Sequence, residues 1–314
     1  MNQNIIRLLF ASLLILSVNI LRSQPSEHVY TDHHVHLQDS ATVQLGFRML
    51  KATGQSPTKM DSLIFDADTI IERLNIAHFK AAWIISNAYW FGSPLTPVQN
   101  EYEEVKKQND WIAEQAARFP DRLFPFMSVN PLKPYALKEI QRCAENKTFT
   151  GLKLHFANSK IDLKNKEQLA RLGKVFELAN KKHLLMLVHF RNGQSWDARS
   201  QTEIFLNQLL PLAKNTKVVI AHMAGWGSYD KSTDAALEMI VRYMHRNGPC
   251  SKNLYFDVSA VLPVDSEGSD TLAKEKNNWN AITALNKRVK QFGTAHFFSE
   301  QIGHSSTSIH ISSC

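Results

Sequence analysis

The sequence predicts an α/β protein in which eight parallel strands and the helices between them form a (β/α)8, or TIM, barrel. From residue 29 onward, short apolar runs typical of buried strands alternate with longer stretches of helical periodicity. Residues 184–188 are one continuous apolar run, as expected for a parallel strand buried on both faces. Eight such units in roughly 270 residues fit a closed barrel. An open doubly wound sheet is less favoured, because no glycine-rich phosphate loop follows the first strand.

The expected elements follow one another in strict alternation. Residues 38–62 are expected to form a loop, since they contain Gly46, Gly54 and Pro57. One domain is expected over residues 24–300. The expected strands are residues 29–37, 81–86, 123–130, 149–156, 183–190, 217–223, 253–261 and 294–299. The expected helices are residues 66–80, 97–119, 135–146, 167–182, 202–214, 234–247 and 278–292.

The first 23 residues are typical of a secretory signal peptide. Arg7 precedes an apolar stretch at residues 8–21, and the small residue Ser23 follows. An uncleaved anchor is the alternative, but a membrane span needs about twenty apolar residues. We therefore expect a periplasmic or secreted protein with no stable membrane span once residues 1–23 are removed.

Composition limits the classes of partner. The chain has 36 Lys and Arg against 29 Asp and Glu, a formal charge of +7, but the basic residues are scattered. No basic stripe with interleaved aromatic residues accompanies the charge, which argues against a nucleic-acid partner. Three cysteines far apart give no disulfide framework. The expected partner is a small molecule, and the mild positive charge suits a carboxylate. A homo-oligomer is compatible with the sequence.

Chemically active side chains gather where the expected strands end, which is where barrel enzymes hold their active sites. The first strand ends in Asp32-His33-His34-Val35-His36, and the alternation of strand side chains places His34 and His36 on one face. Two imidazoles on one face form half of a first-row metal site. The later strand ends contribute Lys153 and His155, His189 and the nearby Arg191, His222, and Asp257.

These motifs resemble the amidohydrolase superfamily, and within it the amidohydrolase-related group that includes aminocarboxymuconate-semialdehyde decarboxylase-like enzymes. The resemblance implies a metal-dependent hydrolase barrel in which His34, His36 and His189 bind one divalent metal ion, usually zinc. It implies that His222 is a catalytic group and that an Asp ending strand 8 completes the site. The resemblance covers roughly residues 29–300 and rests on Asp32-x-His34-x-His36, Gly151-Leu152-Lys153, His189 and His222-Met223-Ala224-Gly225.

The chemistry of such a site is consistent with hydrolysis. Three neutral ligands leave an open position at which water acquires a pKa of about 7. A carboxylate takes the proton of the attacking water, and His222 stabilises the oxyanion or protonates the leaving group. We therefore expect hydrolysis of a small amide, lactone or related C–N or C–O bond. The alternative within enzymes is non-oxidative decarboxylation of an aromatic or unsaturated carboxylic acid.

Two basic residues are candidate substrate-binding groups. The resemblance gives Lys153 two interpretations: a carbamylated lysine bridging two metals, or a lysine that contacts substrate or packs. Arg191 is a candidate clamp for a substrate carboxylate, because a guanidinium pairs with a carboxylate through two hydrogen bonds. The alternative is a surface arginine.

The chain departs from the family pattern at its end. Residues 296–300 finish in Glu300 with no Asp, and the serine-rich residues 301–314 form an irregular tail without helical periodicity, so the last helix is expected to be missing. Glu300 is one candidate replacement for the missing catalytic carboxylate. The other explanation is a shifted reading frame near the end of the chain, with the strand 8 Asp and the last helix encoded just downstream in another frame. An inactive truncated barrel or binding protein is the non-enzyme alternative.

Overall fold

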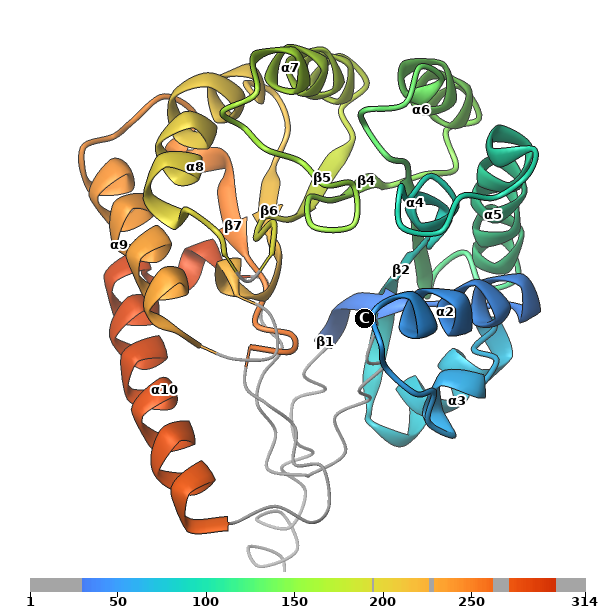
Figure 1. Cartoon of the computed structure of the whole chain (residues 1–314), viewed down its shortest axis with the longest axis horizontal. Coiled ribbons are helices and arrows are strands. Elements are labelled where there is room, and N and C mark those ends of the chain that lie inside the picture. Colours follow the sequence, from blue (N-terminus) through green and yellow to red (C-terminus); the bar gives the residue numbers. More distant parts are fainter. Residues whose placement is uncertain (1–29, 194, 226–228, 262–270, 298–314) are drawn as a thin grey trace, which may run out of the picture.

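The computed structural model describes residues 30–193, 195–225, 229–261 and 271–297. Within them, seven parallel strands lie in sequence order in one sheet, each paired with the next. The sheet curls into a partial barrel with the longer helices outside it (Figure 1). The strands are β1 (Tyr30–His36), β2 (Phe79–Ile85), β3 (Leu123–Ser128), β4 (Gly151–His155), β5 (Leu185–His189), β6 (Val218–Ile220) and β7 (Leu254–Phe256).

Helices connect successive strands, as the right-handed crossovers of a parallel sheet require. This arrangement confirms the predicted α/β barrel fold. The helices are α2 (Ser40–Ala52), α3 (Ala67–Ile76), α4 (Ala88–Phe91), α5 (Glu101–Ala117), α6 (Ala136–Glu145), α7 (Lys166–Lys181), α8 (Ala198–Ile204), α9 (Lys231–His245) and α10 (Thr271–Phe292). No helix in these described ranges is both long enough and apolar enough to cross a membrane.

The expected eighth strand does not form among the residues that the structure describes. Thr294–His296 is a 3-10 turn, and Phe297 then makes an isolated parallel bridge to Phe256 of β7. The chain thus reaches the place beside β7 where an eighth strand would begin. Glu300, residues 1–23, which were expected to be a signal peptide, and the tail 301–314 all lie outside the described ranges.

The expectation of a loop over residues 38–62 is wrong, because helix α2 occupies Ser40–Ala52. Asp39 caps this helix by accepting a hydrogen bond from the Thr42 amide at 2.8 Å. The helix buries Leu45 and Met49 on one face, a periodicity that outweighs the glycine within it. Of the residues that suggested a loop, Gly46 lies within the helix, while Gly54 and Pro57 follow its end.

Several further elements differ from expectation. The strand expected at 253–261 ends at Phe256, and the helix expected at 278–292 begins at Thr271. The helix expected at 202–214 begins earlier as α8 and then changes to a π turn at Phe205–Leu209 and a 3-10 turn at Leu210–Leu212. Pro211 lacks an amide proton, so the regular ladder cannot continue through it. The strand expected at 217–223 ends at Ile220, because the next residues form a turn.

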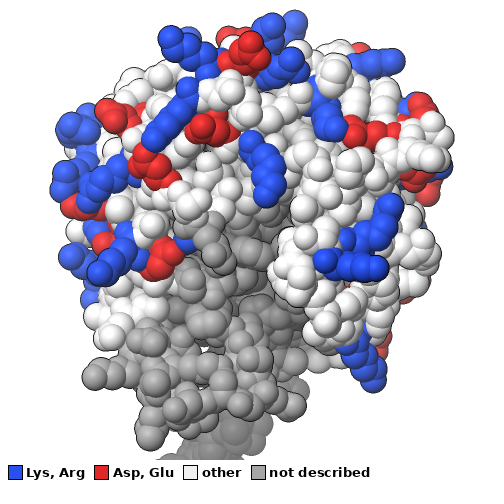
Figure 2. Space-filling model, viewed as in Figure 1, with Lys and Arg blue, Asp and Glu red and all other residues white. Residues whose placement is uncertain are grey.

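The barrel interior is filled by apolar side chains. Gly151 in β4 permits this filling: a Cβ there would lie 2.2 Å from the Phe126 ring and 2.6 Å from the Leu185 carbonyl oxygen. On the face shown in Figure 2, acidic and basic side chains intermingle around the rim rather than forming a continuous stripe. The interior cluster consists of Trp83, Ile85, Phe126, Leu187, Val219 and Ala221.

Candidate active site

The histidines predicted from the strand ends come together at the carboxyl end of the sheet. His34 and His36 belong to β1, and His189 ends β5. The pairing of β1 with β2 shifts register between Asp32 and Val35, so the strand has an irregularity at the motif itself. His34 and His36 nevertheless lie close, with ring centroids 5.3 Å apart.

The rings form one continuous cluster. His34 stacks on His222 with centroids 4.6 Å apart, and His222 lies 5.1 Å from His189. His189 in turn stacks on His155 at 3.9 Å and an interplanar angle of 10°. Thus the three predicted metal ligands and the predicted catalytic histidine share one buried site. Their individual roles stay predictions.

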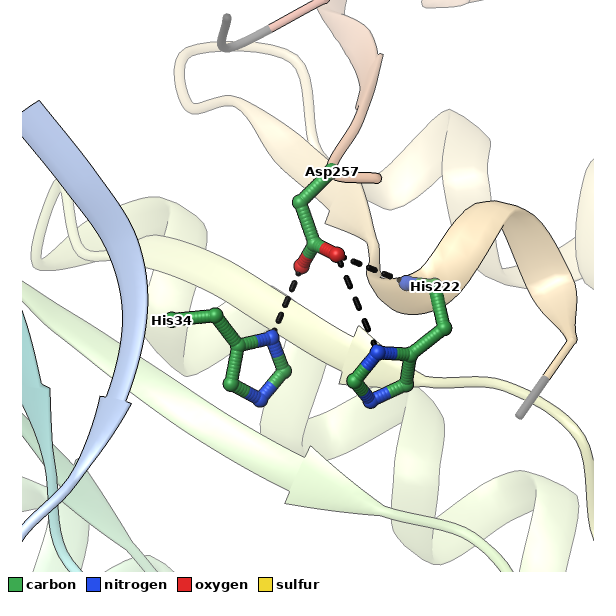
Figure 3. Close-up of side chains that lie close together, drawn as sticks. All are labelled: His34, His222 and Asp257. Carbon is green, nitrogen blue, oxygen red and sulfur yellow. Dashed lines mark hydrogen bonds and ion pairs between the residues drawn. The ribbon is translucent and has the colours of Figure 1, made fainter. Parts of the chain in front are cut away.

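Asp257, which follows β7, joins two of these histidines (Figure 3). One carboxylate oxygen, Oδ2, lies 2.9 Å from His34 Nδ1. The other, Oδ1, accepts a hydrogen bond from the His222 amide at 2.8 Å. Oδ1 also accepts from the Ser259 amide at 3.1 Å and from the Ser259 hydroxyl at 2.7 Å. The carboxylate therefore has hydrogen-bond partners on both oxygens.

The backbone around His222 is held in an unusual conformation. His222, Met223 and Ala224 have φ values of 56°, 45° and 60°, in the left-handed region that L-residues with side chains disfavour. Such strain persists only where surrounding contacts fix it, and it concentrates at functional sites. Here the Asp257 side chain binds the His222 amide, and the Asp257 carbonyl accepts from the Met223 amide at 3.0 Å.

Lys153 lies inside the cluster and is completely buried. Its Nζ is 3.0 Å from His34 Nε2. Burial lowers the pKa of Lys153 to about 7, and the charge of Asp257 opposes that shift. The position places Lys153 in the candidate site, and its substrate-binding and carbamylation interpretations both remain predictions.

Burial sets the charge of the other groups. It lowers the pKa of each of the clustered histidines, to about 3 for His222, so these rings are neutral at pH 7. Burial alone would raise the pKa of Asp257, but His34, His222 and the hydrogen bonds outweigh it and hold that pKa well below the ordinary value. The site therefore combines a carboxylate with neutral imidazoles.

Arg191 lies close to the end of β5, but its guanidinium has protein partners. It pairs with Asp230 Oδ2 at 2.8 Å and donates to Thr233 Oγ1 at 3.3 Å, both near the start of α9. It also donates to the Gly193 carbonyl at 3.1 Å. These contacts connect the loop after β5 to α9. Its role as a substrate clamp stays a prediction.

Sequence reasoning did not assign roles to four residues at this site. The roles of Asp257 and Ser259 depend on partners on other strands. His155 appeared in the sequence beside Lys153, but its stacking on His189 was not expected. Tyr89 of α4 stacks on His155 with centroids 5.1 Å apart, and its buried hydroxyl has no hydrogen-bond partner among the described residues. The polar end of strand 4 was the available signal for His155.

The donor set fits a divalent metal ion. Within the described ranges, His34, His222 and Asp257 form a group whose ligand atoms all lie within 4.8 Å of one another. Neutral imidazole and carboxylate are common ligands of zinc, iron and manganese. His36 Nδ1 is buried with no partner in the part of the chain described, as expected of an atom beside a missing group.

Comparison with known proteins identifies the family of this chain. The amidohydrolase family model matches residues 31–294, most of the chain. No curated protein matches the chain.

Three solved structures show the same fold at low sequence identity. The chain is 14% identical to 5-carboxyvanillate decarboxylase LigW from Sphingomonas paucimobilis, with a TM-score of 0.59 over 86% of this chain and 87% of that one. The second structure is 5-carboxyvanillate decarboxylase from Novosphingobium aromaticivorans, complexed with manganese and 4-hydroxy-3-methoxy-5-nitrobenzoic acid. Its sequence identity is 14% and its TM-score 0.56, over 87% of this chain and 85% of that one. The third is 2,6-dihydroxybenzoate decarboxylase from Rhizobium, with a sequence identity of 15% and a TM-score of 0.53 over 86% of each chain. On the family match, the chain belongs to the amidohydrolase family.

Proposed function

We propose that this amidohydrolase-family enzyme hydrolyses a C–N or C–O bond in a small amide, lactone or related molecule. The observation that carries the proposal is the cluster of neutral histidines at the carboxyl ends of the strands, in which His34, His36, His189 and His222 lie ring against ring beside the Asp257 carboxylate. A barrel places its chemistry at this end.

We propose zinc as the resident ion, held by His34, His36 and His189. When bound, such an ion acts as a Lewis acid and lowers the pKa of water, which provides a nucleophile at neutral pH. Manganese is the competing ion, since it is present in the Novosphingobium decarboxylase. Elemental analysis distinguishes the two.

The residues of the chain supply proton transfer and orientation. His222 is neutral, so it can protonate a leaving group only after its ring has taken up the proton of the attacking water, which Glu300 would pass to it. Lys153 supplies a hydrogen-bond donor from inside the cluster. Glu300 is the proposed carboxylate that takes the proton of water, and Arg191 is the proposed clamp for a substrate carboxylate.

Decarboxylation of an aromatic or unsaturated carboxylic acid is the second candidate. It is supported by the similarity to solved decarboxylases of hydroxylated aromatic acids. The same cluster serves either reaction, because both need an electrophilic centre and a proton-transferring group beside the substrate.

The test uses residues 24–314 loaded separately with zinc and manganese. Hydrolysis of a panel of lactones and amides is followed by pH-stat, and carbon dioxide release from hydroxybenzoates is followed in parallel. We expect hydrolysis that falls at least a hundredfold in His222→Asn, a loss typical of removing a general acid or base. Carbon dioxide release without hydrolysis would replace the first candidate by the second. Neither activity with the metal bound would contradict both.

We also propose that the protein is exported and that residues 1–23 are removed. N-terminal sequencing of the protein from its native source tests this. A first residue near Gln24 is the expected result, and an intact Met1 in a cytoplasmic fraction would contradict it.

A further inference from the structure

We propose that Asp257 is a positioning residue that keeps the ring proton of His34 and the backbone of His222 in place, so that both histidines present Nε2 to the active site. The inference rests on the proposed metal-dependent function. It assigns Asp257 a place behind the histidines rather than on the metal. The contacts of each ring carry the argument.

His34 carries its proton on Nδ1. That atom lies 2.9 Å from Asp257 Oδ2, and an ionised carboxylate can only accept a hydrogen bond. A neutral imidazole has one N–H, so Nε2 holds the lone pair. The Nζ of Lys153, 3.0 Å from Nε2, fits this assignment as a donor. Nε2 is thus the atom of His34 that carries the lone pair, and a metal bound there would take the place of the Lys153 hydrogen bond.

His222 has the same tautomer for a different reason. Its Nδ1 lies 2.7 Å from the carbonyl oxygen of Ser259, which is also an acceptor only. Figure 3 shows both rings with Nδ1 toward Asp257 and the second nitrogen on the far side. Two histidines from different strands therefore direct their Nε2 atoms the same way.

Asp257 is fully engaged in this support. Oδ2 faces His34, while Oδ1 receives the His222 amide and both donors of Ser259. Through the His222 amide it also fixes the left-handed turn that carries the second ring. A carboxylate behind a metal-binding histidine fixes ring orientation and tautomer, and its loss typically weakens metal binding about 10–100-fold.

The substitution Asp257→Asn separates this role from that of a ligand. The amide oxygen of Asn is expected at the Oδ1 position, where it meets three donors, so the NH2 group faces His34 Nδ1. Two donors cannot face each other, so we expect the proton of His34 to move to Nε2 and the Lys153 amine to give up its donor contact with that atom. His222 keeps its tautomer, because the Ser259 carbonyl is unchanged, and it serves as an internal control. A carboxylate-to-amide change behind a histidine is known to produce such a wrong tautomer.

The first measurement is a long-range 1H–15N NMR spectrum of metal-free protein with 15N-labelled histidine. The chain has 13 histidines, so the signals of His34 and His222 are assigned with single His→Gln variants. We expect Nδ1–H for both rings in the wild type. In Asp257→Asn we expect Nε2–H for His34 alone. An Nε2–H ring in the wild type, or an unchanged His34 in the variant, would overturn the proposal.

The second measurement is calorimetric titration with Zn²⁺ alone. We expect Asp257→Asn to weaken binding about 10–100-fold. The matched control is Asp234→Asn, the same change at a carboxylate paired with Arg288, and it is expected to leave affinity unchanged. Weaker binding with His34 still Nδ1–H would make Asp257 a direct ligand and refute the positioning role. A wild type that binds no metal would instead refute the proposed function, while the NMR result stands.

Discussion

Replacing Asp257 by Ala should destabilise the metal-free protein by at least about 3 kcal/mol, or about 1 kcal/mol or more for each of three N–H groups left without an acceptor. The carboxylate accepts hydrogen bonds from His34 Nδ1, the His222 amide and both donors of Ser259 at 2.7–3.1 Å. A buried donor left without an acceptor costs about 1–3 kcal/mol. The Ser259 hydroxyl can rotate to another partner, so three N–H groups dominate the loss.

The variant Asp257→Asn calibrates this estimate, because an amide oxygen retains the three bonds at Oδ1. We expect it to lose only about 1 kcal/mol. The assay is urea unfolding of metal-free protein at pH 7, followed by circular dichroism. An Ala variant within 1 kcal/mol of the wild type, or equal losses for Ala and Asn, would refute this account of the hydrogen bonds around Asp257.

Three further predictions concern the fold and its ion. Gly151→Ala should lower the free energy of unfolding by at least about 3 kcal/mol, because the new Cβ would lie 2.2 Å from the Phe126 ring. Gly173→Ala in α7, where the nearest contact is 3.6 Å, should raise it by about 0.5–1 kcal/mol. Thermal melts of the two variants test both expectations. Burial would raise the pKa of Glu139, but hydrogen bonds led by Arg142 hold it below the ordinary value. Its stabilisation is therefore complete above about pH 4.5 and lost as pH falls through the folded pKa, so acid titration of unfolding should be shallower in Glu139→Gln. Zinc at a hundred times its Kd should stabilise the chain by about 2.7 kcal/mol, and an unshifted melt in a metal-binding protein would contradict this.

Much of the fold could be predicted from local sequence. Apolar runs such as residues 184–188 correctly predicted the seven strands, whereas the eighth expected run gives only an isolated bridge at Phe297 among the described residues. The clustering of His34, His189 and His222 follows from that pattern, because the carboxyl ends of parallel strands meet at one edge. Helix α2 was missed because its glycine was weighted above the periodic Leu45 and Met49.

The remaining features depend on contacts between distant segments. Asp257 contacts His34 across 223 residues and the His222 amide across 35, so its partners cannot be read from local spacing. The irregularity in β1 arises from its register with β2, which a single strand does not specify. The contact of Tyr89 could not be predicted for the same reason, because its ring stacks on His155 only when α4 packs against the end of β4.

The most direct test of the central claim is the metal content of purified residues 24–314, measured by elemental analysis beside the His34→Ala/His36→Ala variant. We predict about one divalent ion per chain in the wild type, most of it zinc, and its loss in the double variant with the fold retained by circular dichroism. No ion in the wild type, or the same ion content in both proteins, would contradict a metal centre built on these histidines.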